Sequence, residues 1–412
     1  MTDKKFTLRD YQKKAVKKAK KIISLNKIVI LNFEVRTGKT HIALEIAKNY
    51  NKVLFVTKKK AISSIEKDYN TANHSFDILI INYESLHKVK GSFDLVIVDE
   101  SHSIASYPKP SKRAKDLKKL ISNDLILMTG TLLPESNSQI YHQLWVSPFS
   151  PFREFKNFYN FHKKFGIASK IYTSYGQAND YSKMNYDSIQ KYIEPIKLSL
   201  TQKEAGFTSG IKEHILEVEM KPTTKKLIKQ LKQDLVIEGK EEVILADTGV
   251  KLMQKVHQLS SGTIKFESGN YKVIDSTKAE FISRYFKGKK IAIFYKFIAE
   301  LEALKECLDI TQDIEEFNSS DKNIALQIVS GREGINLSKA DCLVYYNIDF
   351  SAVSYWQSRD RLTTMQRLEN DVYWIFSKGG IEKNIYKAVL NKKDYVLNTF
   401  KQDERARLSE ED

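Results

Sequence analysis

The sequence predicts an α/β protein with two lobes, each a parallel sheet flanked by helices, and a helical insertion between them. In the first third of the chain, short apolar runs alternate with helical stretches, at 28–31, 53–56, 78–81, 95–98 and 125–128. The last third repeats the pattern, at 291–294, 324–329, 342–346 and 372–376. Continuous apolar runs of this length, separated by helices, are typical of strands that are buried on both faces of a parallel sheet.

The middle of the chain has a different pattern. Residues 146–192 contain twelve Phe and Tyr and no clear strand alternation, whereas 223–238 and 251–259 have the periodicity of amphipathic helices. Aromatics mixed with lysines can stack on bases, but such residues more often form a small helical core. We therefore predict a first lobe at 1–145, a helical insertion with the interlobe hinge at 146–262, and a second lobe at 263–412.

Composition narrows the class of protein. The chain has 412 residues and a net charge of +16, with 67 Lys and Arg against 51 Asp and Glu, so a polyanion such as nucleic acid is the first partner to consider. The alternative explanation for the positive net charge is a genome whose composition favours lysine. No apolar stretch is long enough to span a membrane, and the start has no signal-peptide core. Two cysteines allow neither a disulfide framework nor a cysteine zinc site, which fits a reducing cytoplasm.

A phosphate-binding loop is predicted after the first strand. There the sequence EVRTGKT ends in Gly38, Lys39 and Thr40 and opens an amphipathic helix. Backbone N–H groups at such a helix start bind an anion, the lysine reaches the β- and γ-phosphates, and the threonine hydroxyl can hold Mg²⁺. The strict pattern GxxxxGK[ST] is not met, because Phe33 replaces its first glycine and Arg36 occupies a position where small residues are usual.

A pair of adjacent carboxylates follows a later strand. In FDLVIVDESH, Asp99 and Glu100 come at the end of four apolar residues, the end at which open α/β sheets bind ligands. Two adjacent carboxylates are costly there unless a cation or a water uses them. Asp99 is suited to hold Mg²⁺ and Glu100 to orient and deprotonate an attacking water. An exposed acidic turn is the alternative interpretation.

These motifs, with others in the same order, resemble those of superfamily 2 helicase-type ATPases, and specifically the chromatin-remodeller (SWI/SNF-like) branch in a compact version such as bacteriophages carry. The matching segments of the first lobe are LRDYQ, EVRTGKT, VLFVTKKK, IINYESL, DESH and LMTGTLLPES. The resemblance implies two RecA-like lobes that bind ATP and Mg²⁺. It also implies nucleotide contacts at Arg9, Gln12, Arg36, Thr37, Gly38, Lys39 and Thr40, and coupling of hydrolysis to movement through His102, Thr129 and Thr131.

The second lobe carries three further matching segments, KIAIFYKFIAELEAL, IVSGREGINLSKAD and NIDFSAVSYWQSRDR. The resemblance implies nucleotide contacts at Gly334 and Gln357 and an arginine finger at Arg361, which neutralises charge on the transferred phosphoryl group. The family has a second arginine three positions later, where this chain has Thr364. Candidates to replace it are Arg359, Arg367 and Arg36.

Nucleic-acid contacts are implied by the same resemblance, which places the phosphate backbone across both lobes. The residues at matching positions are Thr57, Lys58, Asn82, Tyr83, Lys296, Ser330 and Arg332. Short polar groups and lysines of this kind position a backbone without reading sequence. A solvated loop is the alternative for Lys58 and its neighbours. The expected function is an ATP-dependent translocase on double-stranded DNA, with no membrane partner.

Three alternatives stay open from the sequence. The first is a strand-separating helicase on forked or branched DNA or on RNA, which normally carries a wedge hairpin or an accessory domain; no such appended domain is evident in the sequence. The second is a non-catalytic nucleic-acid-binding module with a decayed motor, which predicts loss of Lys39, Asp99 or Glu100; all three are present. The third is the motor subunit of a larger DNA-processing complex.

Overall fold

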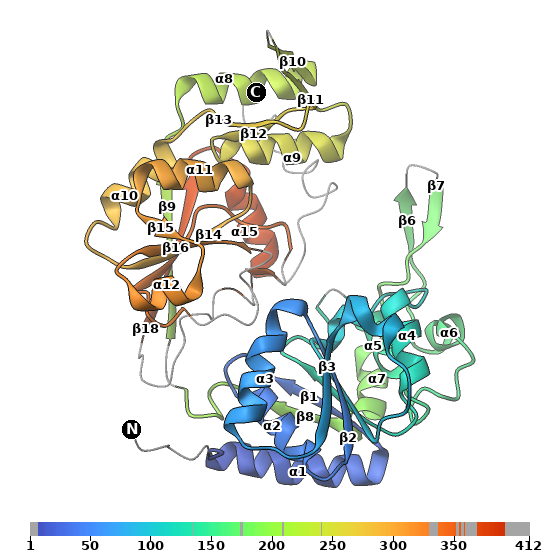
Figure 1. Ribbon diagram of the computed structural model, residues 1–412. Helices are drawn as coiled ribbons and strands as arrows, with labels where there is room; N and C mark the ends of the chain where they lie inside the picture. Colours follow the sequence, from blue (N-terminus) through green and yellow to red (C-terminus); the bar gives the residue numbers. More distant parts are fainter. Residues whose placement is uncertain are drawn as a thin grey trace. The chain divides into compact units, whose positions relative to one another are not determined.

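The computed structural model describes residues 7–134, 136–173, 176–207, 210–239, 241–328, 337–351, 354–355, 358 and 369–391. The chain divides into two compact units, Met1–Thr208 and Ser209–Asp412. Each has its own six-stranded sheet, and each is described by itself (Figure 1). No helix within the described ranges is both long and apolar enough to cross a membrane.

The first unit is built on a six-stranded sheet with the order β3-β2-β4-β5-β1-β8, in which every pairing is parallel. Its strands are β1 (Ile28–Phe33), β2 (Lys52–Thr57), β3 (Asp77–Asn82), β4 (Leu95–Asp99), β5 (Asp124–Thr129) and β8 (Lys197–Leu200). Its helices are α1 (Asp10–Asn26), α2 (Lys39–Ala47), α3 (Ile62–Thr71), α4 (Lys112–Leu120), α5 (Ile140–Trp145), α6 (Phe158–Phe165) and α7 (Tyr186–Ile193). Five short 3₁₀ turns join them, at Lys59–Ala61, Tyr83–Lys88, Ser101–Ile104, Asn137–Gln139 and Glu194–Ile196.

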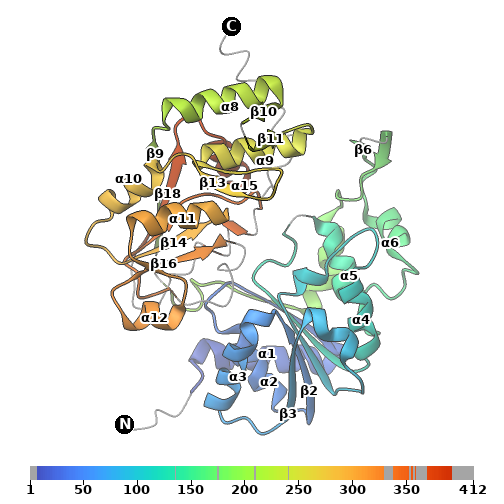
Figure 2. The same ribbon diagram turned by 45° about the horizontal axis from the view of Figure 1, so that its top comes forward.

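Helices cover both faces of this sheet. Successive residues of β1 point to opposite faces, so Val29 and Leu31 pack in one core with α1, α2 and α3, while Ile28 and Ile30 pack in another with α4 to α7. The two groups of helices lie on opposite sides of the strands in Figure 2. A strand buried on both faces has no polar side to alternate with, which explains the continuous apolar run.

The second unit repeats this plan with the strand order β15-β16-β14-β17-β18-β9, again entirely parallel. Its strands are β9 (Gly210–Val218), β14 (Ile291–Tyr295), β15 (Ile310–Thr311), β16 (Asn323–Gln327), β17 (Cys342–Tyr345) and β18 (Glu369–Ser377). Its helices are α8 (Pro222–Asp234), α9 (Gly249–Ser260), α10 (Thr277–Tyr285), α11 (Ile298–Cys307), α12 (Ile314–Ser319) and α15 (Glu382–Leu390). The prediction of two α/β lobes with parallel sheets is therefore confirmed.

Three small hairpins complete the units. In the first unit, β6 (Lys170–Thr173) and β7 (Gly176–Asn179) form a two-stranded antiparallel hairpin that projects beyond the helices in Figure 1. In the second unit, β10 (Val236–Glu238) pairs with β11 (Val243–Leu245), and β12 (Thr263–Lys265) pairs with β13 (Tyr271–Val273). These four strands pack with α8 and α9 around a small separate core.

The two units divide the chain differently from the predicted three segments. The expected insertion at 146–262 is shared between them: Phe152, Phe158 and Phe161 belong to the core of the first unit, whereas 210–262 lies in the second. The reason is that both sheets recruit an edge strand from this region. β8 pairs with β1, and β9 pairs with β18 over nine residue pairs. Phe152, Phe158, Phe161 and Phe165 are buried in a core with α4 to α7, as the interpretation of these aromatics as a helical core predicted.

Candidate functional site

The loop between β1 and α2 has the geometry of an anion-binding turn. Gly38 adopts a left-handed backbone with φ of 79°, and α2 begins at the next residue, Lys39. A Cβ atom at position 38 would lie 2.1 Å from Nε2 of Gln12, so only glycine fits this close approach. The backbone N–H groups of the first turn of a helix have no partner within the helix and bind anions well.

Side chains of α1 hold this loop in place. The backbone carbonyl of Thr37 accepts hydrogen bonds from Tyr11 Oη at 3.2 Å and from Gln12 Nε2 at 3.4 Å. Gln12 Oε1 in turn accepts a hydrogen bond from the backbone N–H of Arg9 at 2.9 Å. The Thr37 hydroxyl donates to the Glu34 carbonyl at 2.8 Å. Arg9, Gln12 and Thr37 were expected only as nucleotide contacts, and Tyr11 was not singled out. The structure adds a role for these residues in shaping the loop.

Lys39 lies against the same loop. Its Nζ donates to the carbonyl of Phe33 at 2.8 Å and lies 3.4 Å from that of Glu34. A lysine held in this position can exchange a carbonyl for a phosphate oxygen with a small rotation of its side chain. Arg36, which departs from the usual small residue of such loops, adopts a left-handed backbone with φ of 66°.

The segment after β8 forms hydrogen bonds to the loop between β1 and α2 that the sequence did not predict. The backbone N–H of Gln202 donates to Glu34 Oε2 at 2.7 Å, and Gln202 Nε2 donates to the carbonyl of Val35 at 3.1 Å. These residues are more than 160 positions apart in sequence, and no local pattern links them. The recruitment of β8 as an edge strand beside β1 is what brings Gln202 to the loop.

The acidic pair lies at the same edge of the sheet. β4 and β1 flank β5 on its two sides, so the carboxyl end of β4, with Asp99 and Glu100, is two strands away from the loop that follows β1. Thr57 Oγ1 donates to Asp99 Oδ2 at 2.9 Å, and the Glu100 N–H donates to Asp99 Oδ1 at 3.0 Å. The Asp99 carboxylate is therefore fixed in orientation on both oxygens.

The electrostatics of this pair favour a cation. Burial and, next to it, the charge of Glu100 together raise the pKa of Asp99 to about 7, against the opposing effects of the Thr57 hydroxyl and the Lys39 ammonium. A buried carboxylate beside a second one is stabilised by a nearby positive ion. Mg²⁺ commonly takes one or two protein oxygens and completes its shell with phosphates and water. The Asp99 carboxylate and the Thr40 hydroxyl fit that donor set.

His102 connects the acidic pair to the end of β5. Its Nδ1 lies 3.3 Å from Glu100 Oε2 and 3.2 Å from Thr129 Oγ1. The Thr129 hydroxyl has an acceptor in the Thr131 carbonyl at 2.9 Å, and when it donates there it accepts from His102, which favours the tautomer with the proton on Nδ1. The structure thus brings together the three residues expected to couple hydrolysis to movement.

Two of the expected nucleic-acid contacts point inward. Thr57 and Tyr83 have only 1% and 3% of their surface exposed, and the Tyr83 hydroxyl bonds the backbone carbonyl of Asp99. This differs from the expected phosphate contacts, because side chains alternate in direction at a strand end. Their neighbours Lys58 and Asn82 are partly exposed at the ends of β2 and β3, with Lys59 and Lys60 exposed beside them.

In the second unit, the expected contact Lys296 is paired within the protein. Its Nζ lies 2.7 Å from Asp349 Oδ1 and 3.9 Å from the centre of the Phe350 ring. Asp349 also accepts a hydrogen bond from Ser354 Oγ at 2.7 Å. The pair lowers the pKa of Asp349, although its burial acts in the opposite direction. A phosphate at Lys296 would compete with Asp349 for the ammonium group.

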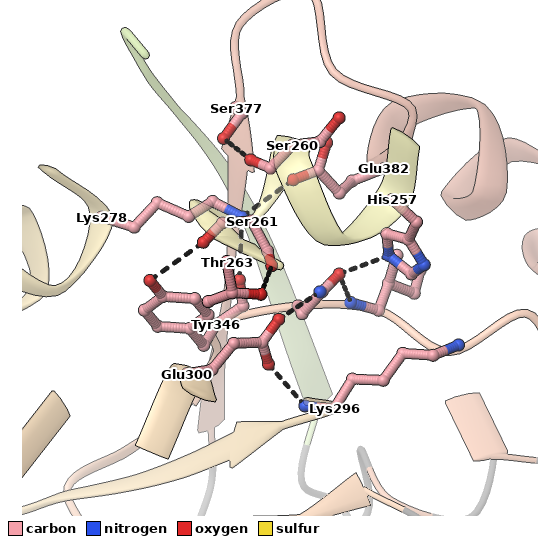
Figure 3. A network of polar contacts seen from close by, with 12 residues as sticks. His257, Ser260, Ser261, Thr263, Lys278, Lys296, Glu300, Tyr346, Ser377 and Glu382 are labelled. Atoms are coloured by element: carbon pink, nitrogen blue, oxygen red, sulfur yellow. Dashed lines mark hydrogen bonds and ion pairs between the residues drawn. The ribbon is translucent and has the colours of Figure 1, made fainter. Parts of the chain in front are cut away.

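A buried polar network lies next to Lys296 (Figure 3). Glu300 accepts hydrogen bonds from the backbone N–H of Lys296 at 2.7 Å and from Asn347 Nδ2 at 2.5 Å. Asn347 Oδ1 accepts from His257 Nε2 at 2.6 Å. Burial raises the pKa of Glu300 and lowers that of His257. The network fixes the turns that follow β14 and β17, which carry Lys296 and Asp349.

A second part of the network is the buried ion pair between Lys278 and Glu382, whose charged atoms are 2.9 Å apart. Lys278 Nζ also donates to the Tyr346 carbonyl at 3.0 Å. Removing one partner of such a pair leaves an uncompensated buried charge and is strongly destabilising. This pair anchors α10 and α15 to the end of β17, and we assign it a structural role.

The remaining sequence-predicted site residues lie outside the described part of the chain. They are Ser330, Arg332, Gly334, Gln357 and Arg361, together with Arg359, Thr364 and Arg367, which concern the second arginine. Within the described ranges, no group of three His, Cys, Asp or Glu side chains is arranged to hold a metal.

Comparison with known proteins gives one family match. A family model described as the SNF2-related domain matches residues 8–296. Among solved structures, the Sulfolobus solfataricus SWI2/SNF2 ATPase core in complex with dsDNA is similar with a TM-score of 0.44 and 16% identity, covering 94% of this chain and 91% of that chain. The SWI2/SNF2 ATPase core domain from the same organism gives 0.43 and 18%, covering 94% and 89%. No curated protein sequence matches.

Proposed function

The chain belongs to the SNF2-related family, and on this premise we propose that it is an ATP-dependent motor that moves along double-stranded DNA. The observation that carries the proposal is the shared sheet edge: the glycine loop before α2 and the acidic pair after β4 follow strands that flank β5. Phosphoryl transfer requires a phosphate cradle and a carboxylate pair within one site, and this topology supplies both.

In this proposal, ATP is held by the loop and the first turn of α2. Lys39 contacts the β- and γ-phosphates, Gln12 contacts the adenine, and Arg9, Arg36 and Thr37 complete the contacts. Thr40 and Asp99 hold Mg²⁺, which neutralises charge on the phosphates when it is bound. Glu100 orients the attacking water and takes its proton. His102 reports the state of Glu100 to Thr129 and Thr131.

The second lobe contributes residues that the sequence alone assigns. Gly334 and Gln357 contact the nucleotide and Arg361 acts as the arginine finger. For Arg361→Ala we expect ATP binding to stay within about threefold of wild type while hydrolysis falls by about 10³-fold or more. An equal loss of binding and hydrolysis would remove this role. Arg367→Ala, made in parallel, tests whether that residue replaces the missing second arginine.

The track is assigned to the phosphate backbone of DNA. Lys58, Asn82 and Lys296 are the candidate contacts among the described residues, with Ser330 and Arg332 added from the sequence. The net charge of +16 supports a sequence-independent interaction, whose affinity falls steeply as salt displaces bound counterions. The family assignment supports the proposal of double-stranded rather than single-stranded DNA, and RNA is a further substrate to test.

The central experiment measures ATP turnover with no nucleic acid and with single-stranded DNA, duplex DNA, branched DNA and RNA. Duplex DNA is expected to stimulate wild-type turnover most strongly. Lys39→Ala and Glu100→Gln serve as inactive controls in every condition. Displacement of a triplex-forming strand ahead of the motor then reports translocation on duplex DNA. If none of the four nucleic acids raises wild-type turnover above the level without nucleic acid, the proposal fails.

Strand separation is a second candidate because of one observation, the β6–β7 hairpin that projects from the first unit (Figure 1). Helicases that separate strands commonly use a hairpin as a wedge. Replacing 171–178 by a short Gly-Ser linker should abolish strand separation on forked DNA if the hairpin is a wedge, while duplex-stimulated ATP turnover is retained. Absence of strand separation by the wild-type protein removes this candidate. A role as the motor subunit of a larger complex is compatible with either activity.

A further inference from the structure

The acidic pair is held in a strained conformation by a tyrosine from a neighbouring strand end. Glu100 has a left-handed backbone with φ of 50° and ψ of 53°, a conformation that is unfavourable for a residue with a side chain. The Tyr83 hydroxyl donates to the carbonyl of Asp99 and lies 3.4 Å from that of Glu100. It therefore binds both carbonyls of the turn in which the strain is stored.

A threonine from the adjacent strand holds the side chain of the same pair. Thr57 is the last residue of β2 and its hydroxyl donates to Asp99 Oδ2 at 2.9 Å. With the Glu100 N–H on Oδ1 at 3.0 Å, the Asp99 carboxylate has one protein donor on each oxygen. A carboxylate oxygen can accept two hydrogen bonds, so these contacts fix the orientation and leave capacity for a cation.

Both residues lie directly beside candidate nucleic-acid contacts. Thr57 pairs with Asn82 in the register between β2 and β3, and Tyr83 follows Asn82 in sequence. Lys58 follows Thr57. At these two strand ends, the hydroxyls of Thr57 and Tyr83 point inward to the acidic turn. The residues next to them in sequence, Lys58 and Asn82, are partly exposed. A movement of one strand end of less than 1 Å changes a hydrogen bond of this length substantially.

Charged side chains lie next to the Tyr83 ring. The guanidinium of Arg113 lies 5.5 Å from the centre of the Tyr83 ring and forms an ion pair with the exposed Glu84 at 2.7 Å. Together with Lys58, Lys59 and Lys60, Arg113 adds basic groups at this edge of the first unit. A polyanion that binds here contacts the residues on either side of both hydroxyls.

We propose that Thr57 and Tyr83 are positioning residues that couple nucleic-acid binding at Lys58 and Asn82 to the geometry of Asp99 and Glu100. The inference rests on the proposed function and deepens it, because it names the physical link between the track and the hydrolytic site. Neither residue contacts the reacting atoms. Each acts through a single hydroxyl. Thr57 holds the Asp99 carboxylate, which is proposed to hold the cation, and Tyr83 holds the backbone that orients the Glu100 side chain.

The test uses variants that remove only these hydroxyls. Tyr83→Phe and Thr57→Val are each expected to lower kcat at saturating duplex DNA by about tenfold or more, and to lower the ratio of DNA-stimulated to basal turnover. The KM for ATP and the Kd for duplex DNA should stay within about twofold. Thr57→Ser restores the hydroxyl and should recover most of kcat. Lys58→Gln, in contrast, should raise the Kd for DNA.

The chain provides a matched control for each variant. Tyr141→Phe removes a buried hydroxyl that donates to the Phe155 carbonyl at 3.1 Å in the same unit. Thr224→Val removes a buried hydroxyl that donates to the Asp275 carboxylate at 2.8 Å in the second unit. Both are expected to keep wild-type kcat and the wild-type stimulation ratio. Thermal melting of all variants separates loss of fold from loss of positioning.

The outcomes distinguish this inference from the proposed function. Stimulation of the wild type together with unchanged kcat in Tyr83→Phe and Thr57→Val overturns the inference alone. A weaker Kd for DNA with unchanged kcat at saturation also overturns it, because the two residues would then be phosphate contacts. If basal and DNA-stimulated turnover fall by the same factor in these two variants, the residues do not couple DNA binding to hydrolysis, and the inference is overturned. Absence of stimulation in the wild type overturns the proposed function, and the coupling with it.

Discussion

The side chain of Gln12 occupies the space that a Cβ atom at Gly38 would need. An ideal Cβ there would lie 2.1 Å from Nε2 and 3.4 Å from Cδ of Gln12. The glutamine that the sequence assigns to adenine recognition thus also closes the back of the phosphate loop, where it donates to the Thr37 carbonyl at 3.4 Å. In the proposed function, one carboxamide thus links base recognition to the shape of the loop.

Gly38→Ala is expected to lower the affinity for ATP by about tenfold or more. Alanine in the left-handed conformation costs about 1–2 kcal/mol, and its methyl group collides with Gln12. Gln12→Ala lowers the affinity by itself, because it removes the proposed adenine contact, but in this background Gly38→Ala should cost less affinity, since the collision is absent and only the backbone cost remains. Gly269→Ala is the control, because Gly269 has φ of 95° and no atom within 4 Å of a Cβ. Fluorescent nucleotide titration measures the affinities; no further loss from Gly38→Ala in the Gln12→Ala background would contradict the backbone contribution.

Glu100→Gln is expected to bind ATP with wild-type affinity and to hydrolyse it about 10²–10⁴-fold more slowly. The substitution keeps the shape and removes the group that takes the proton of the attacking water. Glu84→Gln is a suitable control, since Glu84 is an exposed carboxylate of the same unit that pairs with Arg113. Single-turnover hydrolysis is the measurement. Turnover within tenfold of wild type would show that another group activates the water.

His102→Ala should lower DNA-stimulated ATP turnover by about tenfold, whereas His102→Asn should retain most of it. An asparagine amide can donate from nearly the same position as Nδ1, which lies 3.3 Å from Glu100 Oε2 and 3.2 Å from Thr129 Oγ1. The Kd for duplex DNA should change little in either variant. Equal loss in both would show that the imidazole ring, rather than its Nδ1 proton, is required.

In the absence of Mg²⁺ and nucleotide, Asp99→Asn should raise the melting temperature of the first unit at pH 8 by about 5 °C, or about 2 kcal/mol. Burial, with the charge of Glu100, raises the pKa of Asp99 to about 7 from its usual value of 3.8. Folding therefore takes up a proton between pH 4 and 7, and the stability of the wild type falls as pH rises through this window.

Melting curves with EDTA between pH 4 and pH 8 check this prediction. The difference between Asp99→Asn and wild type should become small near pH 4, where the carboxyl is protonated in the folded protein and nearly half protonated in the unfolded chain. Adding Mg²⁺ and ADP should narrow the difference at pH 8, because the cation stabilises the charged form of Asp99 only. Identical melting temperatures at pH 8 without metal would mean that water already stabilises this charge.

Much of the fold could be predicted from local sequence. Strands buried on both faces are continuous apolar runs, so β1, β2, β4 and β5 were found close to their observed bounds. The edge strands β8 and β9 were missed. An edge strand is partly exposed and has a weaker pattern: in β9, buried and exposed residues are mixed along nine positions. Their pairing with β1 and β18 is the reason that the expected middle segment is shared between the units.

The sequence by itself determined that the chain has two parallel sheets. It also indicated which residues are candidates for the chemistry, because a glycine loop and an acidic pair depend on spacing along one strand and the turn after it. The tertiary structure alone decided what surrounds those residues. Thr57 and Tyr83 point into the acidic turn, Gln202 braces the loop, and Lys296 is paired with Asp349. These contacts join strand ends that are distant in sequence. They follow from the order of strands in a sheet, which local periodicity does not encode.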